Sequence, residues 1–191
     1  MVNEDLEAIT ASWKTTTLRI KLSSHEKAAL EAIYKQSKRS HDITTTLHDI
    51  LKGIRETTDI DFPEKSAEIV LYRLGDKGCI SYWGILYKLT PKGYSIFESE
   101  HTVLSRIVTE LYKIHKSIRF EWVTMPLLAA GVYLGDYGVT KHYLERLNRI
   151  QKVVDLRETQ KDTNILTDYK LTDTGMRLAD HLLQKASKNQ V

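Results

Sequence analysis

The sequence has little cysteine and proline, and it has no long hydrophobic run. One cysteine stands among 191 residues, so no disulfide can form within the chain, as expected in a reducing cytosol. No stretch approaches the roughly 18 consecutive apolar residues that a membrane-spanning helix requires. The longest apolar patch, MPLLAAGVYLG at 125–135, predicts a buried helix. We therefore expect a cytoplasmic protein with no membrane partner.

Sequence signatures of catalysis are also missing. Neither GxxxxGK[ST] nor GxGxxG occurs, and the seven histidines do not cluster with Cys79 at metal-ligand spacing. No Ser-His-Asp or Cys-His arrangement can be argued from the spacing. The first ten residues, MVNEDLEAIT, are acidic and lack the apolar region of a signal peptide. We expect a non-enzyme with no cofactor, no metal and no signal peptide.

The composition that is present suits a globular protein. Hydrophobic residues make up 41% and charged residues 28%, which is enough apolar material for one domain or two small ones. The formal net charge is +3 and the isoelectric point is near 8.8. This charge is compatible with a polyanionic partner such as nucleic acid but does not require one.

One short sequence occurs almost twice. YKLTPKG begins at Tyr87, and YKLTDTG begins at Tyr169. In each copy Tyr-Lys-Leu alternates as a half-buried strand does, and the threonine that follows is a good helix N-cap. The closing glycine falls at the third helical position, where a side chain would collide with a closely packed strand. Each copy therefore predicts a strand, a sharp corner and a helix.

The segments before the two copies also correspond. Each copy follows a helix and a hairpin, and two more helices precede these. In the first half the helices are expected at 24–38, 43–56 and 66–78, with strands at 79–82 and 85–90 around Trp83-Gly84. In the second half they are expected at 103–118, 125–135 and 140–151, with strands at 153–157 and 165–171 around ETQKDTN. One architecture used twice is the prediction.

Three helices followed by a hairpin resemble the winged-helix family of DNA-binding domains. YRLGDKGCISYWGILYKLTPKGYSIFE resembles the stretch from recognition helix to wing in MarR-like and PadR-like regulators, and GVTKHYLERLNRI looks like a recognition helix. The resemblance implies a mainly α fold with small β-hairpin wings (α+β), as two winged-helix domains in tandem. The expected organisation is a disordered or loosely ordered segment 1–14, a first domain 15–100 and a second domain 101–191.

Charge distinguishes the two candidate recognition helices. On 62–78 three cations are balanced by three acids, whereas on 139–152 four cations oppose only Glu145. The second helix and its longer wing are therefore expected to contact double-stranded DNA, in a sequence-specific regulator of transcription. The candidate contacts are Thr140, Lys141, His142, Arg146, Arg149, Lys152, Arg157 and Lys161. The alternative is an ordinary solvated basic face.

The N-terminal segment TTTLRIKLSSHEKAALEAIYKQSKRSHDITTTLHDILKGI has a second resemblance. It resembles a ribbon-helix-helix domain, in which a strand lies in the major groove. That resemblance implies base contacts from Thr17, Arg19 and Lys21. The other interpretation, which we favour, is a strand pairing within the first winged-helix domain.

Partners follow from the same patterns. Apolar residues between Pro91 and Ile118 recur with a seven-residue period, which suits either a dimer helix or two helices packing inward. We expect a homodimer, since winged-helix regulators usually pair on two half-sites, and a possible protein partner at the first domain. Two alternative functions stay open: a protein-binding scaffold like SMC or ESCRT accessory subunits, and a replication or partition protein that binds repeated DNA sites.

Overall fold

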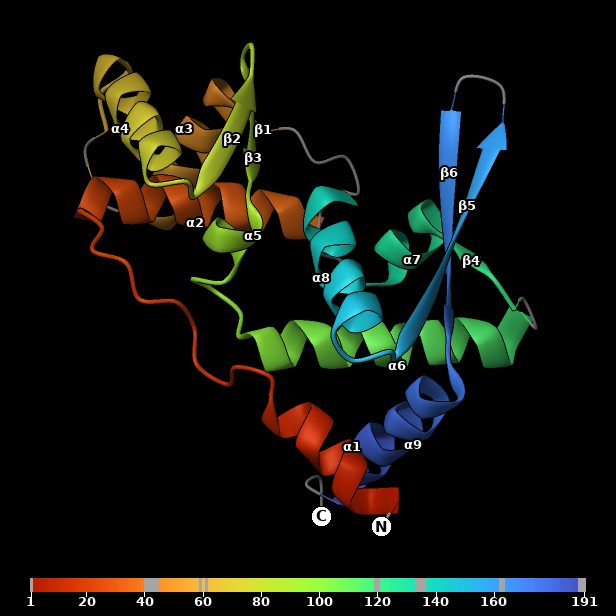
Figure 1. Cartoon of the computed structure of the whole chain (residues 1–191). Helices are drawn as coiled ribbons and strands as arrows, with labels where there is room; N and C mark the ends of the chain where they lie inside the picture. The colour runs from red at the N-terminus through yellow and green to blue at the C-terminus, as the bar shows by residue number, and fades with distance from the viewer. Residues whose placement is uncertain are drawn as a thin grey trace. The chain divides into compact units, whose positions relative to one another are not determined.

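The structure, a computed structural model, describes most of the chain in two compact units (Figure 1). The described residues are 2–39, 45–58, 60, 62–118, 121–132, 137–161 and 164–188. We name the units the N-unit, Thr17–Glu98 with Tyr133–Val139, and the C-unit, Met1–Thr16 with Ser99–Val132 and Thr140–Val191. Whether 15–100 and 101–191 fold as independent domains stays a prediction.

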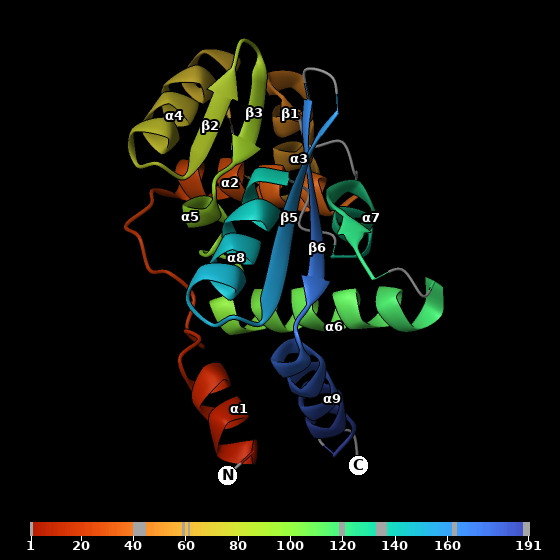
Figure 2. The same cartoon turned by 45° about the vertical axis from the view of Figure 1, so that its right-hand side comes forward.

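The N-unit contains helices and a small sheet. Its elements are α2 (Ser24–Arg39), β1 (Thr45–Thr46), α3 (Leu47–Thr57), α4 (Glu64–Asp76), β2 (Ile80–Trp83), β3 (Leu86–Leu89) and α5 (Pro91–Tyr94). The strands form an antiparallel sheet in the order β1-β3-β2. The β2–β3 hairpin lies beside α4 in both views of the fold (Figure 2).

The C-unit repeats this order of elements. Its elements are α1 (Val2–Ala11), α6 (Glu100–Ile118), β4 (Val123–Thr124), α7 (Met125–Val132), α8 (Tyr137–Arg149, from Thr140 onward), β5 (Val154–Lys161), β6 (Asn164–Leu171) and α9 (Asp173–Lys188). The sheet order β4-β6-β5 corresponds to β1-β3-β2. The described chain is thus mainly helical with two small antiparallel sheets, as predicted for the α+β class.

Both hairpins differ in detail from the sequence prediction. In the N-unit Trp83 pairs with Leu86, so the turn is Gly84-Ile85 and not Trp83-Gly84. Gly84 has a φ of +59°, which a tight hairpin turn requires and glycine adopts without strain. In the C-unit the ladder continues to the pair Lys161–Asn164, so most of the polar stretch expected as a loop is strand.

The first copy of the repeated sequence forms a corner between strand and helix. The Thr90 hydroxyl accepts a hydrogen bond from the Gly93 N–H at 3.1 Å and donates one to the Gly78 carbonyl at 2.7 Å. A Cβ atom on Gly93 would overlap the carbonyl oxygen of Cys79. The predicted N-cap and the predicted close approach of a strand are therefore both confirmed.

The second copy forms the same corner. The Thr172 hydroxyl accepts from the Gly175 N–H at 3.1 Å and donates to the Lys152 carbonyl at 2.8 Å. A Cβ atom on Gly175 would overlap the carbonyl oxygen of Val153. The two copies of the repeated sequence therefore form the same hydrogen bonds and the same close contact at their glycine.

Helix α6 decides between the two interpretations of the seven-residue period. Its apolar residues at these positions, Leu104, Ile107, Leu111 and Ile114, are at most 6% exposed. A bend of several residues separates α6 from the short helix α5, so 91–118 is not one continuous helix. The apolar stripe packs inward, and it is not available to a second copy of the chain.

The N-terminus differs from the loosely ordered segment that was expected. Val2–Ala11 form α1, and Leu6 and Trp13 are 4% and 2% exposed. The Trp13 indole N–H donates to the side chain of Gln151 at 2.8 Å, which belongs to the same unit. The sequence prediction missed this order because the stabilising partners lie far away along the chain.

Candidate nucleic-acid interface

Helix α8 has a buried side and an exposed side. Tyr143, Leu144 and Leu147 are at most 4% exposed, and their three- and four-residue spacing forms one apolar stripe. Four of the predicted DNA-contacting side chains are exposed on α8 or just after it: Lys141, His142, Arg149 and Lys152. The only acidic residue of the helix, Glu145, is partly buried. The exposed side is therefore predominantly basic.

Thr140, the first of the predicted contacts, is not on this exposed side. It is fully buried, with 0% of its surface exposed. Thr140 precedes Tyr143, Leu144 and Leu147 by three, four and seven residues, which places it on their side of the helix. The helical period explains the difference from the sequence prediction, which rested on the residue type of Thr140 and its position near the helix start.

Arg146 is engaged within the C-unit. Its guanidinium lies 2.6 Å from a carboxylate oxygen of Glu100 on α6, and the two side chains are 29% and 10% exposed. The contact is a close ion pair without aligned hydrogen-bond geometry. Arg146 therefore anchors α8 to α6, a role that its position in the sequence did not reveal because Glu100 is distant along the chain.

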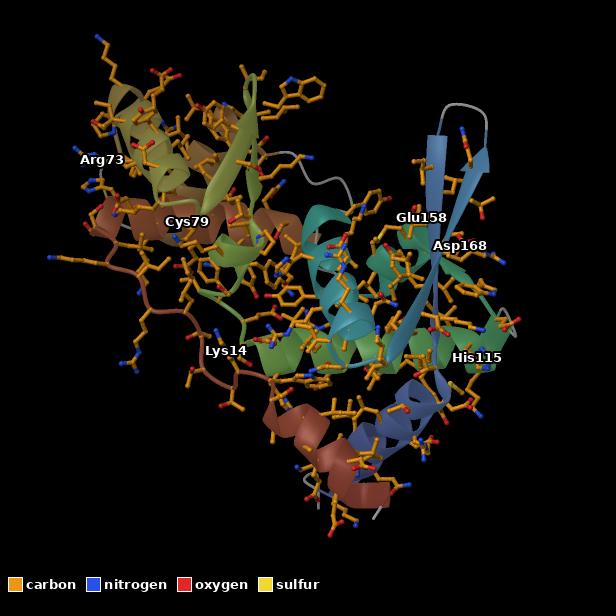
Figure 3. The ribbon with its side chains drawn as sticks, in the orientation of Figure 1. Lys14, Arg73, Cys79, His115, Glu158 and Asp168 are labelled. Carbon is orange, nitrogen blue, oxygen red and sulfur yellow. The ribbon has the colours of Figure 1, made fainter. Side chains whose placement is uncertain are left out.

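Two cations at the base of the β5–β6 hairpin lie against the ring of Trp122. The guanidinium carbon of Arg157 and the ammonium of Lys170 lie 4.5 Å and 4.8 Å from the centre of the Trp122 ring. Arg157 also pairs with Asp168 at 2.7 Å across the two strands, and Asp168 is labelled in Figure 3. The charge pattern of the sequence predicted a role for Arg157, whereas no local pattern in the sequence indicates Trp122.

Each of the two cations at the base of the hairpin has an acidic partner. Lys170 pairs with Glu121 at 3.0 Å, and the hydrogen bond from Lys170 lowers the pKa of Glu121. Arg157 keeps 49% of its side chain exposed despite its pair with Asp168. Arg157 can therefore still bind a phosphate, although Asp168 already neutralises part of its charge.

Lys161 lies at the end of β5, where its backbone pairs with Asn164. The side chain of Lys161 is outside the described part of the structure. Its predicted contact with DNA stays a prediction.

The segment proposed to form an N-terminal strand is extended but belongs to no described strand, although the Leu18 N–H donates a hydrogen bond to the Ser95 carbonyl at 2.7 Å. No strand forms between residues 17 and 23, all of which the structure describes. Thr17, Arg19 and Lys21 are exposed, and the first strand of the N-unit is Thr45–Thr46. The strand pairing within the first domain, which we favoured, is therefore wrong. A ribbon strand pairs only between two chains, so the ribbon-helix-helix interpretation stays a prediction. Leu18 is 40% exposed, and Ile20 and Leu22 are only partly buried, so the alternating apolar residues do not form a fully buried face.

Burial of Tyr169 on β6 raises the pKa of its phenol to about 12. Within the described residues, no group of three or more histidine, cysteine, aspartate or glutamate side chains is placed to hold a metal ion. No helix in the described ranges has the length and apolar character needed to cross a membrane.

Comparisons with protein families, with curated proteins and with solved structures found no match.

The corresponding helix of the N-unit has a different surface. Helix α4 exposes two cations and two acids along one stripe, with Ile69 and Tyr72 between them, 57% and 62% exposed. Its hairpin tip exposes Trp83, which is 85% accessible, and Ile85. The exposed side of α8 is thus mainly basic, with Ile150 exposed just after the helix, whereas the stripe on α4 has no net charge and two apolar residues at its centre.

Proposed function

We propose that the C-unit binds double-stranded DNA as a winged-helix domain, with α8 as its recognition helix and β5–β6 as its wing. The N-unit is a second winged-helix domain with a different partner. The chain is a sequence-specific DNA-binding regulator of transcription in the cytoplasm, active as a homodimer and without a catalytic activity.

The order of elements supports the winged-helix proposal. Both units run helix, short strand, helix, helix, strand, strand, and in both the short strand pairs with the last strand of the hairpin. A winged helix has this order, with its third helix in the major groove and its hairpin beside the DNA backbone. The eight-residue strands of β5–β6 make a longer wing than the four-residue strands of β2–β3.

The observation that carries the proposal is the charge on the exposed side of α8. Lys141, Arg149 and Lys152 are exposed with His142 beside them, and Glu145 is the one acid of the helix. Lysine and arginine on such a face neutralise phosphates, and arginine can also bind guanine with two hydrogen bonds. In this proposal Arg146 positions the helix, and Lys141 and Arg149 contact DNA.

Duplex binding tests the proposal. The protein is incubated with a random pool of labelled duplexes at low and physiological salt, and retained sequences are identified. Enrichment of one motif is expected. Lys141→Ala combined with Arg149→Ala should weaken binding to that motif by about tenfold or more, since each lost base or phosphate contact costs about 1 kcal/mol or more.

The matched control removes two other exposed cations of the same unit. Lys185→Ala combined with Lys188→Ala, near the end of α9, lowers the net charge equally and should change affinity much less. No retention of duplex even at low salt would refute the DNA proposal. Equal losses in the two double variants would refute the assignment of α8.

A protein-binding scaffold is the second candidate, and the exposed apolar side of α4 favours it for the N-unit. A replication or partition protein would use the same duplex contacts. It would be distinguished by enrichment of tandemly repeated copies of the motif in place of single sites.

A further inference from the structure

The exposed side of α4 carries an ordered stripe of six residues. The stripe consists of Lys65, Glu68, Ile69, Tyr72, Arg73 and Asp76. Their spacing of three, four, seven, eight and eleven residues from Lys65 places them on one side of a helix. Buried Ala67, Val70, Leu71 and Leu74 occupy the opposite side, so the stripe belongs wholly to the surface.

The charges of this stripe are inverted about its centre. From the N-terminal end the order is positive, negative, apolar, apolar, positive, negative. Positions at equal distances from the centre of the stripe carry opposite charges. Lys65 corresponds to Asp76 in this way, and Glu68 corresponds to Arg73. Ile69 corresponds to Tyr72. Within the described residues, none of the four charged side chains forms an ion pair with another group.

The hairpin extends the apolar centre of the stripe. The Tyr82 ring lies beside Gly75 on α4, where an added Cβ atom would be 3.6 Å away. Tyr82 is 59% exposed, and Figure 2 shows the hairpin alongside the helix. Ile69, Tyr72 and Tyr82 therefore form an exposed apolar surface, flanked by the four charges. Figure 3 shows Arg73 projecting outward from α4.

We propose that this stripe binds a second copy of the chain, with the two α4 helices antiparallel about a two-fold axis between positions 70 and 71. In that arrangement Lys65 faces Asp76 of the second copy, and Glu68 faces its Arg73. Ile69 of each copy packs on Tyr72 of the other. A two-fold interface requires one surface to be complementary to itself, and the inverted charges meet this requirement.

Other occupants suit the stripe less well. The two cations and two acids cancel, so a polyanion such as DNA gains no attraction, and a strongly acidic or basic protein gains none either. An uncharged apolar partner would leave all four charges without counterparts. A second antiparallel copy provides a counterpart for every charge and covers the apolar centre.

Charge reversal tests the arrangement, with dimerisation measured by analytical ultracentrifugation in the absence of nucleic acid. Glu68→Arg places arginine against arginine, and Arg73→Glu places glutamate against glutamate, twice per dimer in each case. Each variant alone should dimerise about tenfold or more weakly than the wild type. An equimolar mixture of the two variants should form heterodimers, because each reversed residue then faces an opposite charge.

Restored association in the mixture would show that residues 68 and 73 of the two copies face each other. A folding defect in either variant would not be restored by mixing. The matched controls are Glu56→Arg and Arg55→Glu, exposed on α3, which should leave dimerisation unchanged alone and mixed. Circular dichroism verifies that each variant is folded. A wild type that stays monomeric would overturn the proposal, as would a dimer unaffected by either reversal or variants whose mixture fails to associate. The proposal does not depend on DNA binding: Lys141→Ala with Arg149→Ala should dimerise normally.

Discussion

Two corresponding residues differ between the halves although their backbones agree. Gly78 and Lys152 stand at the same place in the two corners, where each carbonyl accepts a hydrogen bond from the N-capping threonine. Their φ angles are +67° and +54°. This left-handed conformation is free of strain for glycine but costs a residue with a side chain about 1–2 kcal/mol. The C-unit therefore keeps a strained lysine beside its basic helix.

We expect Lys152→Gly to raise the free energy of unfolding of the protein by about 0.5–1 kcal/mol, since relief of strain outweighs the added entropy of glycine in the unfolded chain. Gly78→Ala should lower it by about 1 kcal/mol. Urea denaturation followed by tryptophan fluorescence measures both. If Lys152→Gly instead destabilises the protein, as a glycine within a helix does, then Lys152 is not strained by its positive φ angle. Weaker DNA binding by stable Lys152→Gly would fit a functional reason for keeping lysine.

Among the secondary-structure elements, α8 depends on contacts with residues that lie outside the helix. Its apolar stripe packs into the C-unit, and its ion pair with Glu100 ties it to α6. Glu100 is largely buried, so removal of its partner would leave a carboxylate poorly solvated. Arg146 and Arg149 are the same residue type one turn apart, yet they have different environments.

Arg146→Gln should therefore lower the free energy of unfolding by about 1–3 kcal/mol, because a charged contact to a largely buried group is lost. Arg149→Gln should change stability by less than about 0.5 kcal/mol, as most surface substitutions do, while it weakens duplex binding. Chemical denaturation and fluorescence anisotropy on the same two variants separate the effects. The assignment fails if Arg149→Gln destabilises the protein as much as Arg146→Gln does.

At the scale of the whole molecule, charge is distributed differently over the two units. In the proposed assembly, the C-unit contributes the DNA-binding cations, and the N-unit pairs two copies through a surface with no net charge. A dimer would then bring two basic helices to one duplex. Affinity and its salt dependence would come from both copies together.

The salt dependence of duplex affinity measures how many copies contact DNA. A plot of log affinity against log salt concentration has a slope of about −0.9 for each phosphate neutralised. If two copies bind together, the slope for Glu68→Arg should be about half that of the wild type. An equal slope for the two proteins would mean that a single copy makes all the phosphate contacts. The Glu56→Arg variant serves as the control for the change in net charge.

The sequence by itself determined the local features of this protein. The two Thr-x-x-Gly corners, the order of helices and hairpins, and the basic side of α8 depend on residues within about one helical turn or one strand. Hydrogen-bonding capacity, the missing Cβ of glycine and helical period act over that range. The inverted charge pattern of α4 is also local in the sequence. Only the structure shows that all six residues of the stripe are exposed.

The tertiary structure alone decided which side chains are available. It buried Thr140, paired Arg146 with Glu100, set Arg157 against Trp122 and ordered the N-terminal helix around Trp13. It also left 17–23 without a strand partner within the chain. These outcomes depend on groups brought together from distant parts of the chain. Their contacts form only when the core packs, because the spacing of residues along the chain does not indicate which distant residues will be in contact.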